Sequence, residues 1–153
     1  MPPSPAPTTV HGDYRLGNVI FATGAPARVA AVFDWEMATI GDPLADVGYL
    51  SVMWAEQDDP PLDMFELSGV TRRESFPSRT ELVERYERLS GRKVTDIRWY
   101  RTLAVWRTVV FMEGSYRRAL AGSTDDPWLH GFGEGVVALA EACRAHGARI
   151  GLT

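Results

Sequence analysis

Two short β-prone runs lie between polar motifs near the start of the chain, and this arrangement constrains the fold more than any other feature. The runs are residues 19–22 and 29–33, and the Thr-Gly-Ala-Pro between them has the composition of a turn. HGDYRLGN (residues 11–18) precedes the predicted hairpin, while FDWE (33–36) and GDPLAD (41–46) follow it. The fold must therefore place several acidic side chains around one hairpin.

Clustered carboxylates need a compensating charge, because they repel one another unless a cation or a set of donors offsets them. A hard divalent ion such as Mg²⁺ is the economical explanation, since it prefers oxygen ligands. A single His-x-Asp would be weak evidence, and a loop-capping role is the alternative interpretation of Asp13. The spacing of Asn18 and Asp34 relative to Asp13 favours a catalytic loop instead.

The remainder of the chain is predicted to be mainly helical, which gives an α+β, mostly helical fold class. Apolar residues recur every three or four positions, a capping box stands at Ser78 and Glu81, and Gly91 and Gly147 are expected to end helices. Residues 57–77, with three prolines and no period, are predicted to form an irregular surface loop. One hairpin and about four helices are expected. The helices are predicted at residues 44–56, 78–90, 96–120 and 134–146.

Composition narrows the class of protein. A chain of 153 residues fits one domain, predicted to span residues 10–153 after a flexible, proline-rich lead at 1–9. The net charge of −4 argues against a nucleic-acid partner. The single cysteine, Cys143, cannot form an internal disulfide, and no apolar run suits a signal or membrane span. We therefore expect a cytoplasmic location, with no membrane contact.

The motifs together resemble the aminoglycoside phosphotransferases and their choline-kinase-like, protein-kinase-like relatives. His-Gly-Asp with Asn five residues past the Asp is similar to their catalytic loop, and protein kinases share this spacing. DWEMATIGDPLADVGYL, PSRTELVERYERLSG and WYRTLAVWRTVVFMEG resemble a branch of the family whose members are sometimes fused to acyl-CoA dehydrogenases. The resemblance runs from Val10 to about His146.

This resemblance implies a phosphotransferase that uses ATP or GTP and acts on a hydroxyl of a small molecule. Asp13 would accept the proton of the substrate hydroxyl, while Asn18 and Asp34 would hold Mg²⁺ at the nucleotide phosphates. His11 would buttress the catalytic loop and Asp46 would fix it through hydrogen bonds. The sequence leaves two roles open for Glu36, which could lie near the metal or cap the following turn.

The resemblance also implies that a part of the family's fold is missing. A kinase of this type carries a glycine-rich phosphate cover, a strand lysine and an adenine hinge upstream of the catalytic loop. Only ten residues precede His11, and the sole lysine, Lys93, lies downstream. We therefore expect the C-terminal catalytic lobe without its N-terminal lobe, nearly inactive alone. Exposed apolar surface would then favour a homo-oligomer or a separate N-lobe chain.

Two other functions stay open from the sequence. One is a non-catalytic, truncated kinase-like module that binds or scaffolds. A weaker one is a metal-dependent hydrolase that uses Asp13, Asp34 and Asp42, although two-metal sites usually recruit histidines that this chain lacks. Trp35 is predicted to shape the pocket floor beside Asp34. Three other tryptophans lie within helical patterns and are predicted to be core: Trp54, Trp99 and Trp106.

Overall fold

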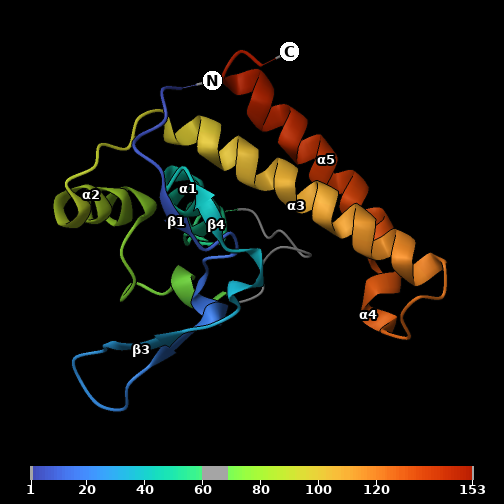
Figure 1. Ribbon diagram of the computed structural model, residues 1–153, viewed down its shortest axis with the longest axis horizontal. Coiled ribbons are helices and arrows are strands. Elements are labelled where there is room, and N and C mark those ends of the chain that lie inside the picture. Colours follow the sequence, from blue (N-terminus) through green and yellow to red (C-terminus); the bar gives the residue numbers. More distant parts are fainter. Residues whose placement is uncertain (1, 60–68, 153) are drawn as a thin grey trace.

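The computed structural model describes residues 2–59 and 69–152, which form two small β ladders followed by helices (Figure 1). In this part of the chain the fold is mixed and mostly helical, as the sequence predicts. The strands are β1 (Thr8–Val10), β2 (Val19–Phe21), β3 (Val29–Val32) and β4 (Thr39–Gly41). The helices are α1 (Leu44–Val52), α2 (Arg79–Ser90), α3 (Ile97–Leu120), α4 (Pro127–His130) and α5 (Phe132–Arg149), with short 3-10 turns η1 (Leu16–Asn18), η2 (Trp35–Met37) and η3 (Gly69–Arg72).

The two ladders frame the polar motifs. β2 and β3 form the predicted antiparallel hairpin, with Val19 opposite Val32. The sequence did not predict the second ladder, in which β1 pairs antiparallel with β4 and Thr9 lies opposite Ile40. Strands of three residues carry too little alternation to be recognised, and β1 begins at Thr8, within the proposed flexible lead. The β1–β4 pairing closes the segment that contains the hairpin.

Helix α1 is held tightly against α3. Leu44 and Tyr100 are almost fully buried, at 0 % and 1 % exposure, and Val47 packs with them. The helices approach so closely at Gly48 that a Cβ there would lie 2.6 Å from the Cβ of Tyr100. Since α1 follows directly from β4, this contact fixes the position of the polar motifs relative to the helices.

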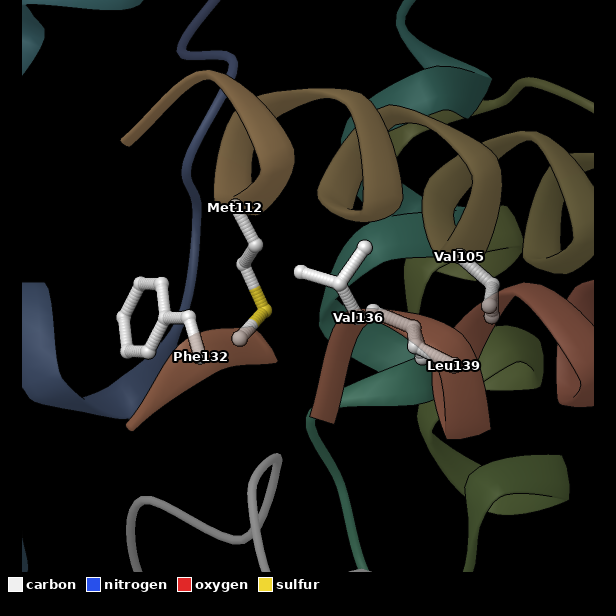
Figure 2. Packing of buried hydrophobic residues seen from close by; sticks show 5 residues of the cluster. All are labelled: Val105, Met112, Phe132, Val136 and Leu139. Carbon is white, nitrogen blue, oxygen red and sulfur yellow. The ribbon is translucent and has the colours of Figure 1, made fainter. Parts of the chain in front are cut away.

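Helices α3 and α5 run side by side and enclose a second core (Figure 1). Val105 and Met112 of α3 meet Phe132, Val136 and Leu139 of α5 in this layer (Figure 2). All five are less than 9 % exposed. The hairpin β2–β3 projects away from these two helices (Figure 1).

Several helix boundaries follow local chemistry. The capping box at Ser78 is present: the Ser78 hydroxyl accepts from the Glu81 amide, and the Glu81 carboxylate accepts from the Ser78 amide at 2.8 Å. Gly91 ends α2 with a φ of 69°. The prediction that the last helix spans 134–146 and stops at Gly147 is wrong. Gly147 lies inside α5, which continues to Arg149, and its carbonyl accepts from the Leu152 amide at 2.9 Å.

Two further predictions need correction. The expected loop at 57–77 is not wholly irregular, because η3 lies within it and the Thr71 hydroxyl donates to the carbonyl of Ala55 at 2.9 Å; residues 60–68 fall outside the described part. Trp54 is core at 7 % exposure, but Trp106 is 54 % exposed. Trp106 lies on α3 and lines a groove between α3 and α5 that the described residues do not fill. No helix in the described part is long and apolar enough to span a bilayer.

Candidate active site

His11 is the buried centre of the loop that joins β1 to β2. Its ring is 3 % exposed, with Nε2 2.7 Å from the carbonyl oxygen of Phe33 and Nδ1 3.2 Å from the amide nitrogen of Asp13. A carbonyl can only accept and an amide N–H can only donate, so the ring carries its proton on Nε2. The histidine thereby ties the loop to the end of β3.

Asp46 holds the same loop from the first turn of α1. Its two carboxylate oxygens accept from the amides of His11 and Gly12, at 2.7 and 2.9 Å. Hydrogen bonds to an ionised acceptor are stronger than neutral ones. Gly12 adopts a φ of 88°, and a Cβ there would lie 2.6 Å from the carbonyl oxygen of Met37, so only glycine fits this turn.

Asp13 and Asn18 are in direct contact. The Asn18 amide nitrogen donates to the Asp13 carboxylate at 2.7 Å and to the Asp13 carbonyl at 2.8 Å. Both partners are acceptors, which orients the carboxamide with its nitrogen toward Asp13. The carboxamide oxygen of Asn18 therefore faces the other way, and it accepts no hydrogen bond from the described residues. Arg15 lies 3.4 Å from the same Asp13 oxygen.

Tyr49 and Arg107 also reach this loop, and the sequence analysis missed both. Tyr49 lies on α1 beside Asp13; burial, and then its hydrogen bond with the Asp13 carboxylate, raise the pKa of its hydroxyl far above the ordinary value. Arg107 of α3 donates to the carbonyl of Gly12 at 3.4 Å. Tyr49 follows Asp46 by three residues, so helical spacing could have placed both side chains on one face.

Asp34 approaches from the other side, after β3. It adopts a left-handed conformation with φ 65° and ψ 55°, which is uncommon for a residue other than glycine and is typical of functional sites. Its side chain is exposed and makes no hydrogen bond with the described residues. The next residue, Trp35, donates to the Val32 carbonyl and packs its ring 4.6 Å from that of His11.

A cavity of about 430 Å³ opens over this loop. Asp13, Asp34 and Glu36 all line it, whereas His11, Asn18 and Asp46 are not among the described lining residues and hold the loop through hydrogen bonds. Trp35 is not among the described lining residues, so its predicted place on the pocket floor is wrong. The exposed position of Glu36 in η2, at the pocket, leaves both of its roles open.

Asp42 belongs to a different part of the fold. One of its oxygens accepts from the Leu44 amide at 2.9 Å and the other from the Tyr100 hydroxyl at 2.7 Å. It therefore caps α1 and anchors it to α3, and it is not among the described residues that line the cavity. The three aspartates required by the hydrolase alternative do not meet.

The oxygen donors of Asn18, in the loop, and of Asp34, in the cavity lining, suit a hard cation that needs few protein ligands. In the described ranges no three His, Cys, Asp or Glu side chains are grouped as a metal cluster. Mg²⁺ instead retains several waters and takes one or two carboxylates together with phosphate oxygens. The carboxylate of Asp34 and the carboxamide oxygen of Asn18, neither engaged by described residues, are oxygen donors of that kind. The residues present therefore fit Mg²⁺.

Comparison with known proteins gives the family. The sequence pattern of the phosphotransferase enzyme family matches residues 1–101, about two thirds of the chain. The chain therefore belongs to this family, in agreement with the resemblance noted from the motifs.

Longer relatives carry the same region. Acyl-CoA dehydrogenase family member 11 of Gallus gallus is 32 % identical over 138 residues, which cover 86 % of this chain and 17 % of the relative. Acyl-CoA dehydrogenase family member 10 of Mus musculus is 32 % identical over 136 residues, covering 88 % of this chain and 12 % of the relative. The chain thus spans less than a fifth of the length of either.

A solved structure agrees with the fold. A protein from Ralstonia eutropha, provisionally described as an aminoglycoside phosphotransferase, superposes with a TM-score of 0.76 and 28 % identity. The match covers 94 % of this chain and 43 % of that protein. The mixed, mostly helical arrangement described above is thus part of an aminoglycoside phosphotransferase fold.

Proposed function

We propose that the chain is the catalytic, C-terminal half of a phosphotransferase that moves the terminal phosphoryl group of ATP or GTP to a hydroxyl of a small molecule. Family membership supports the reaction class, and the 43 % coverage of the Ralstonia protein supports the assignment to one half of a larger fold. The observation that carries the proposal is the meeting of Asp13 with Asn18, in a loop whose cavity Asp34 also lines.

Asp13 is proposed to accept the proton of the attacking hydroxyl. The bond from that oxygen to the phosphorus forms as the bond to the nucleoside diphosphate breaks, and the proton passes to the carboxylate. Asn18 and Arg15 both contact one oxygen of the Asp13 carboxylate, and Asp13 lines the cavity. Phosphoryl transfer depends mainly on such positioning, together with neutralisation of charge.

Asn18 and Asp34 are proposed to hold Mg²⁺, which when bound neutralises charge on the nucleotide phosphates. The two residues are supported differently. Asn18 is buried and fixed by Asp13, whereas Asp34 is exposed on a left-handed turn. His11 and Asp46 keep the loop in place and are proposed not to touch substrate, because neither is among the described residues that line the cavity.

Titration of the chain with Mn²⁺, followed by electron paramagnetic resonance of the free ion, tests the metal site. One site is expected, and Asp34→Asn and Asn18→Ala should each weaken it by about ten-fold or more. Asp96→Asn is a matched control, because Asp96 is also an exposed aspartate in a left-handed conformation, with φ 51°, and does not line the cavity. Equal affinity in all four proteins would overturn the metal assignment.

The role of Asp13 is tested by ADP release from Mg·ATP in the presence of candidate alcohols, measured on a protein in which an N-terminal lobe completes this chain, because the chain alone is expected to be nearly inactive. Asp13→Asn should keep Mn²⁺ affinity within a few fold and lower release by about 10²–10⁴, the range for removal of a general base. Release that is unchanged in Asp13→Asn would rule out this residue as the base.

A further inference from the structure

The cavity has two chemically different walls. The loop wall carries Asp13 and Asp34, which are assigned above to the reacting end, together with Glu36. The opposite wall comes from α3, α4 and the start of α5, a region distant in sequence from the catalytic loop. The substrate must reach Asp13 with its hydroxyl while the rest of it rests on this helical wall.

The helical wall exposes large apolar side chains. Phe111 and Trp128 line the cavity and are 53 % and 61 % exposed. The Trp128 ring packs edge-on against the buried ring of Phe132, with the centroids 4.6 Å apart. Exposed aromatic surface costs free energy in water, and when it lines a cavity it is typical of a ligand site.

The charges on this wall do not suit a polycation. Among the described residues the wall contributes one carboxylate, Asp126, and it already caps α4 by accepting from the Trp128 amide at 3.0 Å. The guanidinium of Arg107 lies in the same cavity, tethered to the carbonyl of Gly12. Away from the acids of the loop wall, a ligand with several ammonium groups would meet on this wall one engaged acid and a like charge.

We propose that the substrate is an alcohol with an apolar, uncharged body, which binds against Phe111 and Trp128 while its hydroxyl points to Asp13. This inference rests on the proposed phosphotransferase function, since Asp13 defines the reacting end. The two aromatic side chains determine specificity. They act by removing apolar substrate surface from water, so their effect belongs to substrate binding and leaves the metal site unchanged.

Saturation-transfer difference NMR with two probes tests the proposal on the full chain, without nucleotide or metal. Cinnamyl alcohol represents the apolar class and kanamycin the polycationic one. Cinnamyl alcohol should bind with a Kd on the order of millimolar. Trp128→Ala and Phe111→Ala should each raise this Kd by about ten-fold, the equivalent of one lost aromatic contact.

Trp106→Ala is the matched control, because Trp106 is a similarly exposed tryptophan on the same helix as Phe111 and lines a different groove. It should change the Kd by less than about two-fold. Both aromatic residues of the wall are exposed, so their variants should keep the wild-type thermal transition. Kanamycin that binds more tightly than cinnamyl alcohol in ~0.15 M salt, or a Trp106→Ala effect equal to that of Trp128→Ala, would overturn the proposal.

The two proposals fail separately. If Asp34→Asn leaves the Mn²⁺ affinity unchanged while cinnamyl alcohol still binds at Trp128, the phosphotransferase site is refuted. The apolar wall then remains as a binding site. A functional metal site with kanamycin bound in place of cinnamyl alcohol would refute the substrate class alone.

Discussion

Two regions supply the proposed site, and they are built in opposite ways. The loop support, defined as residues 11–18 with α1 and Tyr100, is buried, and its polar groups are paired with one another. The hairpin segment, residues 19–37, exposes large apolar side chains, among them Ile20 at 50 %, Val29 at 55 % and Phe33 at 49 %. Asp13 and Asn18 belong to the first region and Asp34 to the second.

The difference separates what this chain fixes by itself from what it leaves open. The loop support is held by hydrogen bonds from β3, α1 and α3, so Asp13 has one defined position. The hairpin segment contacts the rest of the fold mainly through His11 and the β1–β4 ladder. Exposed apolar surface of this kind is typical of an interface. A partner chain or a second copy on the hairpin remains our proposal.

The largest expected effect is at the α1–α3 contact. Gly48→Ala would place a methyl group 2.7 Å from the Tyr100 carbonyl oxygen, so it should lower the free energy of unfolding by about 3 kcal/mol. In Gly114→Ala, on α3, the new methyl group would meet only the end of Arg118, at 3.7 Å. Because alanine favours the helix over glycine, this variant should raise the free energy of unfolding by about 0.5–1 kcal/mol. Urea unfolding followed by circular dichroism measures both. Similar values for the two would show that the contact is looser than described.

The next effect compares one substitution in the two regions. Asp46→Asn replaces one of two carboxylate acceptors by an NH₂ group, which would then face a backbone N–H. It should lower the free energy of unfolding by about 2 kcal/mol. Asp34→Asn, in an exposed turn that asparagine also tolerates, should change stability by less than about 0.5 kcal/mol. Urea midpoints test this pair, and the comparison between the regions breaks if both variants lose equally.

Alkaline pH should destabilise the fold through the tyrosines of the loop support, since the hairpin segment has no tyrosine. Burial is the first cause that raises the pKa of Tyr49 and of Tyr100, followed by hydrogen bonds to Asp13 and Asp42 respectively. The unfolded chain then releases these protons at lower pH than the folded chain. Stability is therefore full below about pH 10 and is lost as the pH rises toward the folded-state values.

Thermal melts at increasing pH, with absorbance near 295 nm to follow tyrosine ionisation, measure this loss. Tyr49→Phe should make the melting temperature less sensitive to pH above about 10. An unchanged pH dependence in Tyr49→Phe would mean that this hydroxyl is open to solvent in the folded protein.

The smallest effect is expected on the hairpin. Val29→Thr should change the free energy of unfolding by less than about 0.5 kcal/mol, because this side chain is already in water. Val47→Thr is the same exchange at 6 % exposure, on α1, and should cost about 1–2 kcal/mol for burial of a hydroxyl. A large loss for Val29→Thr would indicate that another surface covers the hairpin in solution, and sedimentation of both variants would reveal it.

Local chemistry explains which parts of the fold could be predicted. The hairpin, the capping box at Ser78 and the end of α2 at Gly91 depend on neighbouring residues, and the structure confirms them. The β1–β4 ladder, the length of α5 and the exposure of Trp106 depend on contacts between distant segments. Gly147 shows the limit: a glycine can end a helix or lie inside one, as Gly147 does in α5, and the glycine alone does not decide which.

The sequence by itself determined the family and the mostly helical fold class, and it predicted the residues of a catalytic loop, because the spacing of His11, Asp13, Asn18 and Asp34 lies within short, connected motifs. Only the tertiary structure decided that Tyr49 and Arg107 contact the loop, that Asp42 is not among the described residues that line the cavity, and that aromatic side chains about a hundred residues away form another wall of it. The physical reason is that motif spacing fixes local geometry, whereas burial and pairing depend on how helices pack.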